Sequence, residues 1–187
     1  MENKPVSKFI FVLNGSNESG KDTFVDLIKE MESQLKIKCF HISSVDVIKN
    51  MAKKYGWDGV KNEKGRTLLH DLKEAWDKYN SMTQQDIFRK TKNWIEKSDS
   101  LSSNFLFVDI REPEKIEAYI NSIEKYYGDV VCVGSILIRS SRSVAASNPA
   151  DQGVTNFNYD LTITNNGTID DLKGKAETFV KSLIYYR

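Results

Sequence analysis

The feature that most constrains this chain is a pair of glycines, Gly15 and Gly20, between an apolar run and an amphipathic segment. The run from Phe9 to Leu13 is apolar throughout, as expected for a strand that is buried on both faces. After Lys21 the apolar residues recur at helical spacing, at Phe24, Leu27, Ile28, Met31 and Leu35. The order therefore predicts a strand, a short loop and a helix.

The loop itself has the spacing G-x-x-x-x-G-K of a phosphate-binding P-loop. A triphosphate is densely charged, and backbone N–H groups at a helix N-terminus can surround it only where side chains leave room. Lys21 would then reach the β- and γ-phosphates as a point charge. The predicted phosphate-binding residues are Gly15, Asn17, Ser19, Gly20, Lys21, Asp22 and Thr23.

The predicted metal ligands are Thr23 and Asp109. The motif usually has Ser or Thr directly after the lysine as a Mg²⁺ ligand, but Asp22 occupies that place here, so Thr23 is the expected hydroxyl. Asp22 either has a metal role or complements the helix dipole. Asp109 ends the apolar run of "FLFVDIR", where P-loop proteins keep a carboxylate for Mg²⁺; the alternative is an aspartate that caps the next turn.

Length and charge limit the function further. The 187 residues fit one domain, 1–187, with a substantial core. With 27 basic and 26 acidic residues the net charge is +1, so we expect no nucleic-acid partner and only local anion sites. No segment resembles a signal peptide or a membrane span, which predicts a cytoplasmic protein without a membrane partner.

The cysteines and histidines suggest neither a disulfide framework nor a zinc site. Cys39 and Cys132 lie in apolar runs and are expected to be buried thiols in a reducing compartment. His41 and His70 lack metal-ligand spacing, which argues against a zinc site.

Strand and helix patterns alternate along the rest of the chain. Five strands are expected, which predicts an α/β three-layer P-loop NTPase fold, with a parallel sheet and helices on both faces. Two or three helices fall between the second and third strands, in a region of about 44–98, with one periodic face over 68–79 and another helix over 83–97. Ligands of such sheets lie beyond the carboxyl ends of the strands.

The motifs "GSNESGKDT" and "VDIREPEKIEAY" together resemble the deoxynucleoside monophosphate kinases and, more distantly, the animal-type phosphomevalonate kinases. The closing "NYDLTITNNGTIDDLKGKAETF" is also similar to the end of dephospho-CoA kinases. The resemblance implies ATP as donor, Mg²⁺ as cofactor and a LID at about 139–153, whose Arg139 and Arg142 close over the transferred phosphoryl group. It also places Asn166 and Gly167 near the base of the donor nucleotide. Guanidinium groups suit the charge of this transfer, but two solvated arginines are the ordinary alternative.

The same resemblance implies that the acceptor binds between the second strand's exit and the inserted helices. The implied residues are Ser43, Asp46, Trp57, Lys61, Arg66 and Lys73, with Arg111 near a phosphate. Ser43 and Asp46 are equally good helix-cap residues, and Trp57 is equally suited to a core.

The sequence thus predicts a kinase that transfers the γ-phosphoryl group of ATP to a small phosphorylated acceptor, most simply a nucleoside or deoxynucleoside monophosphate. A phosphate acceptor is ionised at neutral pH, so no general base is needed. Phosphomevalonate and dephospho-coenzyme A are alternative acceptors, and a non-catalytic nucleotide switch, using Gln152, is an alternative function. The oligomeric state stays open, with a homodimer as one option.

Overall fold

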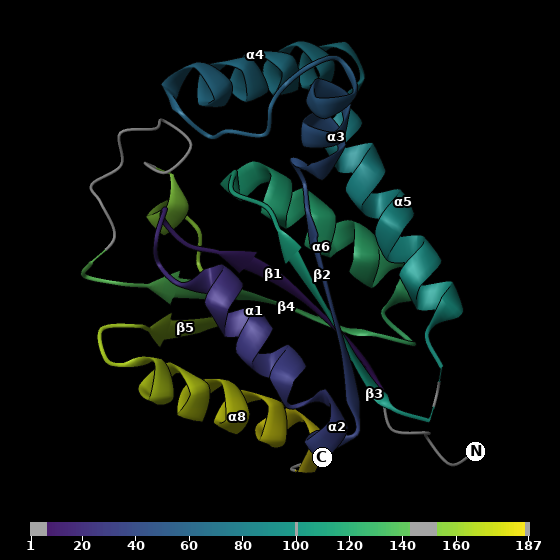
Figure 1. Cartoon of the computed structure of the whole chain (residues 1–187). Coiled ribbons are helices and arrows are strands. Elements are labelled where there is room, and N and C mark those ends of the chain that lie inside the picture. Colours follow the sequence, from purple (N-terminus) through teal and green to yellow (C-terminus); the bar gives the residue numbers. More distant parts are fainter. Residues whose placement is uncertain (1–6, 100, 143–152, 186–187) are drawn as a thin grey trace.

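The computed structural model describes residues 7–99, 101–142 and 153–185, and its centre is a five-stranded sheet (Figure 1). All strand pairs are parallel, in the order β2-β3-β1-β4-β5. The strands are β1 (Lys8–Asn14), β2 (Ile37–Ser43), β3 (Ser103–Asp109), β4 (Cys132–Arg139) and β5 (Leu161–Thr164). The predicted five-stranded α/β architecture is confirmed.

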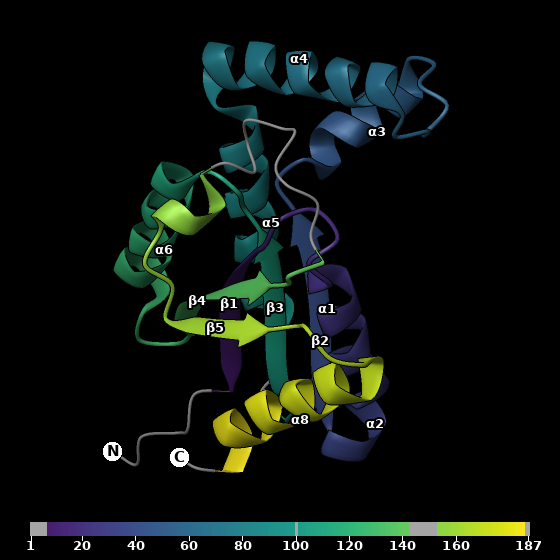
Figure 2. The same ribbon diagram turned by 90° about the vertical axis from the view of Figure 1, so that its left-hand side faces the viewer.

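Helices cover both faces of the sheet and make the three layers (Figures 1 and 2). One face carries α1 (Lys21–Glu30) and α8 (Ile169–Tyr185), with the short α2 (Glu32–Leu35) at the far end of α1. The other face carries α5 (Met82–Lys97) and α6 (Pro113–Tyr127). Pro113 begins α6, where its missing N–H costs nothing, as the sequence predicted.

Two apolar cores arise because successive residues of a strand point to opposite faces. In β1, Phe9, Phe11 and Leu13 pack with the α1 and α8 side, whereas Ile10 and Val12 pack with the α5 and α6 side. The run of β1 is continuously apolar because both faces of this central strand are buried.

The predicted insertion lies between β2 and β3, as α3 (Asp46–Lys54), α4 (Glu63–Asn80) and α5. Figure 2 shows α3 and α4 beyond the carboxyl ends of the strands. The apolar face of α4 is less buried than its periodicity predicts. Leu68 is 40% exposed and Tyr79 is 79% exposed, and Gly65 is the one buried residue of this helix.

The two cysteines differ in environment. Cys39 is buried, as expected, and burial raises the pKa of its thiol to about 12. Cys132 is exposed at the start of β4, so the expectation of two buried thiols was wrong for this residue. Within the described ranges, no helix has the length and hydropathy needed to cross a membrane.

Candidate nucleotide and cation site

The loop between β1 and α1 has the backbone that the glycine spacing predicted. Gly20 precedes α1 with φ 90°, a conformation that costs glycine little. Its N-terminal neighbour Ser19 donates its N–H to the carbonyl of Ser16 at 3.1 Å. A Cβ on Gly15 would lie 2.7 Å from the carbonyl oxygen of Ile138, so this position also requires glycine. The strand, loop and helix are confirmed as a structural unit.

Two asparagines hold this loop from either side. Asn14 accepts a hydrogen bond from the N–H of Gly15 at 2.8 Å, and its amide donates to the carbonyl of Arg111 at 3.1 Å. Asn165 donates to the carbonyl of Ser19 at 2.9 Å. These contacts link the loop to the chain just after β3 and just after β5. Of the two asparagines, only Asn14 is adjacent to the loop in the sequence.

The first turn of α1 carries Lys21, Asp22 and Thr23, as the sequence predicted. Lys21 and Thr23 are half-buried, and Asp22 is exposed. Because the N–H groups of a first helical turn have no partners within the helix, this turn presents donors at the end of β1. That arrangement is chemically suited to binding phosphate.

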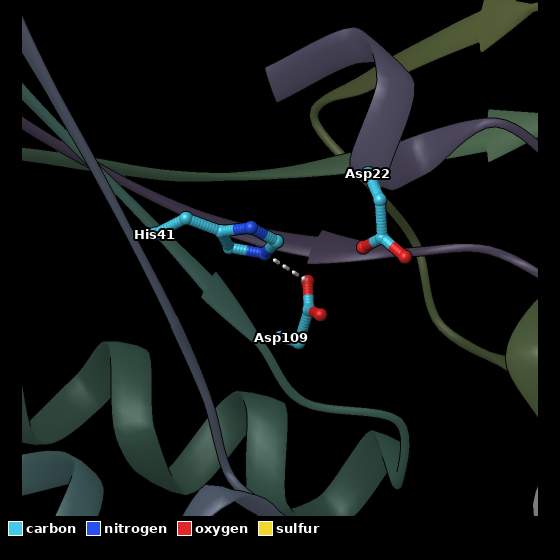
Figure 3. Close-up of side chains that lie close together, drawn as sticks. All are labelled: Asp22, His41 and Asp109. Carbon is cyan, nitrogen blue, oxygen red and sulfur yellow. Dashed lines mark ion pairs between the residues drawn. The ribbon is translucent and has the colours of Figure 1, made fainter. Parts of the chain in front are cut away.

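Asp22 lies close to two residues of the neighbouring strands, His41 of β2 and Asp109 of β3 (Figure 3). One ligand atom from each of the three side chains lies within 4.8 Å of the others, a grouping that could hold a metal ion. His41 Nε2 lies 3.1 Å from Asp109 Oδ1. The cluster brings together two residues named from the sequence, Asp22 and Asp109, and one that sequence spacing did not reveal.

The histidine was missed because its neighbours are distant in the chain. Parallel pairing of β2 with β3 sets Ser43 opposite Asp109, so His41, two residues before Ser43, lies on the same face of the sheet as Asp109. The signal available in the sequence was a histidine that alternates with the apolar residues Ile37 and Cys39 on one face of β2.

The electrostatics of this pair favour a positive charge between the two carboxylates. Burial by itself would lower the pKa of His41, but Asp109 and then Asp22 outweigh it, so the pKa of His41 is raised. Asp109 Oδ1 and His41 Nε2 are both shielded from solvent and form an ion pair when His41 is protonated; apart from each other, neither atom has a hydrogen-bond partner in the described part of the chain. A cation would satisfy both atoms.

Arg142 and the turn after β5 lie together. The guanidinium of Arg142 donates to the carbonyl of Asn165 at 3.1 Å, and Asn166 accepts a hydrogen bond from the N–H of Ser141 at 2.8 Å. A Cβ on Gly167 would lie 2.3 Å from the carboxylate of Asp171, so a larger residue there would displace this side chain. Two regions named separately from the sequence, one for the LID and one for the base, thus form one corner beside the P-loop.

Arg139 ends β4 with an exposed side chain, and its carbonyl accepts from the N–H of Asn165 at 2.6 Å. The greater part of the predicted LID, 143–152, lies outside the described residues, as does Gln152.

The residues named for the acceptor are spread over the insertion. Asp46 is the first residue of α3 and accepts a hydrogen bond from the N–H of Ser43 at 2.9 Å, but the N-cap of α3 is Val45, so neither residue has the helix-cap position that the sequence allowed. Trp57 is half-buried and donates to the carbonyl of Val60 at 3.3 Å. Arg66 is exposed and donates to the carbonyl of Lys61 at 3.0 Å, so both residues lie at the N-terminal end of α4.

Lys73, also named for the acceptor phosphate, has acidic partners instead. Its Nζ lies 2.6 Å from Glu112 and 3.4 Å from Asp77, and Lys115 lies 2.8 Å from Asp77. Burial alone would raise the pKa of Glu112 and of Asp77, but ion pairing, for Glu112 with Lys73 and for Asp77 with Lys115, lowers both. This network joins α4 to the start of α6 beside Arg111.

A separate cavity of about 280 Å³ lies between α5 and α6. Its walls are mostly apolar, with Ile87, Phe88 and Tyr119 among them, and Lys115, which also lines it, is the amine already paired with Asp77. It shares no lining residue with the P-loop or with the Asp22–His41–Asp109 cluster.

Comparison with known proteins supports the fold and leaves the family open. No family model matches the sequence, and no curated protein matches it. Among solved structures, a putative kinase from Chloroflexus aurantiacus aligns with a TM-score of 0.50 at 12% identity, over 97% of this chain and 99% of that one. The APS kinase CysC of Mycobacterium tuberculosis, in complex with AMPPNP and APS, aligns with a TM-score of 0.48 at 13% identity, over 95% and 99%.

The chain has the fold of the P-loop kinases. At these identities the likeness shows the arrangement of strands and helices, and the chemistry of this protein has to be argued from its own residues.

Proposed function

We propose that this protein is a kinase that transfers the γ-phosphoryl group of ATP to a small phosphorylated acceptor, a nucleoside or deoxynucleoside monophosphate. The observation that carries the proposal is the position of Lys21 and the open first turn of α1 beside Asp109. A phosphate cradle, a mobile cation and a carboxylate for the metal are the parts that phosphoryl transfer needs.

The residues present fit a nucleotide-bound Mg²⁺. Asp109 Oδ1 is shielded from solvent and, apart from His41 Nε2 at 3.1 Å, has no polar partner in the described ranges; Asp22 and Thr23 lie in the first turn of the adjacent helix. When bound, the ion neutralises charge on the β- and γ-phosphates. Lys21 and the first-turn N–H groups hold the same oxygens, and Asn14 and Asn165 keep the loop in shape for them.

The acceptor is assigned by position and charge. Arg111 lies two residues after Asp109 at the strand exit, and α4 extends beyond the same ends of the strands (Figure 2). Arg66 lies near the start of α4, and Trp57 lies in the loop before it. A phosphate monoester would be held by guanidinium groups, and its ionised oxygen attacks without a general base. On this assignment, Arg139 and Arg142 neutralise charge that develops on the phosphoryl group during transfer.

The test is ATP consumption by the purified full chain with Mg²⁺, against nucleoside and deoxynucleoside monophosphates, phosphomevalonate and dephospho-coenzyme A, with a no-acceptor control. Stimulation by one monophosphate class is expected. Stimulation only by another acceptor would keep the kinase and replace the substrate, whereas equal slow hydrolysis in every sample would refute the kinase and favour a nucleotide switch.

A lysine variant tests the assigned site. Lys21→Ala should lower the transfer rate by roughly 100-fold or more, since its charge acts on the transition state. Lys29→Ala is the matched control, because Lys29 lies in the same helix, is exposed and pairs with Asp26. Near-normal turnover of Lys21→Ala, with the control also normal, would exclude this loop as the catalytic site.

A further inference from the structure

The Asp22–His41–Asp109 cluster has a composition that differs from an all-oxygen site. Its three side chains come from the first turn of α1, from β2 and from the end of β3, and Figure 3 shows all three directed to one point. They offer two carboxylates and one imidazole nitrogen. A nitrogen donor changes which cation binds well, since Mg²⁺ and Ca²⁺ favour oxygen ligands.

His41 Nε2 and Asp109 Oδ1 have few binding partners other than each other. His41 is 18% exposed and Asp109 is 14% exposed, and the facing Nε2 and Oδ1 atoms are shielded from solvent. The 3.1 Å between them is close enough for an ion pair, yet the pair lacks hydrogen-bond geometry. Exposed Asp22 leaves one side of the cluster open for a cation to enter.

We propose that Asp22, His41 and Asp109 form a binding site for a first-row divalent transition metal, which fills before the nucleotide arrives. Imidazole suits such ions, and the affinity of a mixed nitrogen and oxygen site rises along the series that begins with Mn²⁺. Three protein ligands leave positions for water or phosphate oxygens. The inference rests on the proposed function only in that the same ion would then meet the phosphates held by Lys21.

The first experiment is a titration of the nucleotide-free full chain with Mn²⁺, followed by electron paramagnetic resonance. We expect one tightly bound Mn²⁺ per chain, and we expect Mg²⁺ to displace it only at a large excess. Pulsed measurements should show coupling to a ¹⁴N nucleus, which direct ligation by His41 would cause. Bound Mn²⁺ without nitrogen coupling, or the absence of binding without nucleotide, would overturn the proposal.

Paired variants identify the ligands. His41→Gln should weaken Mn²⁺ binding by about tenfold or more and remove the ¹⁴N coupling, because it deletes one of three protein ligands. His70→Gln is the matched control, since His70 is the other histidine of the sequence and lies exposed on α4. Equal binding by both variants would also overturn the site.

Asp22 has a similar pair of variants. Asp22→Asn should weaken Mn²⁺ binding by about tenfold, whereas Asp26→Asn, an exposed aspartate of the same helix, should not. Circular dichroism of each variant shows that it is folded. Mn²⁺ binding without phosphoryl transfer would refute the kinase and leave the metal site standing, and transfer without nucleotide-free Mn²⁺ binding would do the reverse.

Discussion

At the scale of single residues, the P-loop depends on positions where a side chain cannot fit. Gly20 has φ 90°, and a Cβ there would lie 2.3 Å from the amide nitrogen of Asn165. That amide is the group that donates to the carbonyl of Ser19. One added methyl group would therefore strain the backbone and displace the contact that anchors the loop to the end of β5.

We expect Gly20→Ala to lower the free energy of unfolding by about 1–3 kcal/mol, the cost of a left-handed non-glycine residue with crowding. Urea denaturation measures this. Gly174→Ala is the control: Gly174 lies in α8 with nothing within 4 Å of an added Cβ, so alanine there should raise stability by about 0.5–1 kcal/mol. A Gly20→Ala chain as stable as the wild type would contradict the loop geometry described above.

The residue scale also shows the limit of sequence reasoning. The strand, loop and helix around Gly15 and Gly20 were predictable because the pattern that indicates them is local in the sequence. His41 was not, since it reaches Asp109 only through the pairing of β2 with β3, a choice among several strand orders. Lys73 was named for a phosphate because its charge is visible in the sequence and its partner Glu112 is not a neighbour in it.

At the scale of elements, α4 is linked to the start of α6 by ion pairs, whereas α5 of the same insertion packs on the apolar core. Lys73 joins α4 to Glu112 at the start of α6, and Asp77 of the same helix pairs with Lys115. The pKa of Glu112 is lowered in the folded chain although burial opposes this. A lowered carboxyl pKa stabilises the fold above the unfolded value of 4.5, and this contribution is lost as the pH falls through the folded pKa.

Glu112→Gln should therefore reduce stability by about 1–2 kcal/mol at neutral pH, between the values typical of exposed and of buried ion pairs. The difference from wild type should shrink as the pH falls below 4.5. Urea denaturation at both pH values measures it. Glu177→Gln, which removes an exposed pair with Lys181, is the control and should change stability little at either pH. A difference for Glu112→Gln that does not depend on pH would show that its charge is not the cause.

The helices of the insertion should also differ in their rates of amide exchange. α4 buries only Gly65 among its residues, whereas α5 buries Thr83, Asp86, Ile87, Thr91, Trp94 and Ile95. Local opening costs less free energy where few side chains are buried. Hydrogen exchange followed by mass spectrometry should show the α4 amides exchanging well before those of α5, and slow exchange of α4 in the free chain would contradict the exposed packing of this helix.

Periodicity predicted that α4 is a helix, but not how far its apolar face is buried. A 3.6-residue pattern indicates a face, while the partner for that face depends on tertiary placement. For α5 the partner is the sheet, and Ile87, Trp94 and Ile95 are buried as the pattern predicted. α4 packs mainly against α3 and α5 and has no comparable contact with the sheet. Leu68 and Tyr79 therefore stay exposed.

At the scale of the whole molecule, the central strands of the sheet contribute to both apolar cores and end at the candidate site. Both apolar clusters include residues of β1 and β3, the strands that end at the P-loop and at Asp109. The class of fold was predictable because alternating strands and helices allow few arrangements. The strand order β2-β3-β1-β4-β5 was not, since nothing local in the sequence encodes which strands pair.

A ligand that binds only the folded chain stabilises all of it by mass action. We expect a non-hydrolysable ATP analogue with Mg²⁺ to raise the free energy of unfolding by about 2.7 kcal/mol at 100 times its Kd, and to raise the melting temperature accordingly. Lys21→Ala should melt near the wild-type temperature without ligand but show a smaller increase with it, because the role proposed for Lys21 is to contact the phosphates. Lys29→Ala should keep the full increase, and the measurement is differential scanning fluorimetry. An unchanged melting temperature of the wild type at millimolar analogue would remove the nucleotide site, and with it the reason for a phosphate cradle at the end of β1.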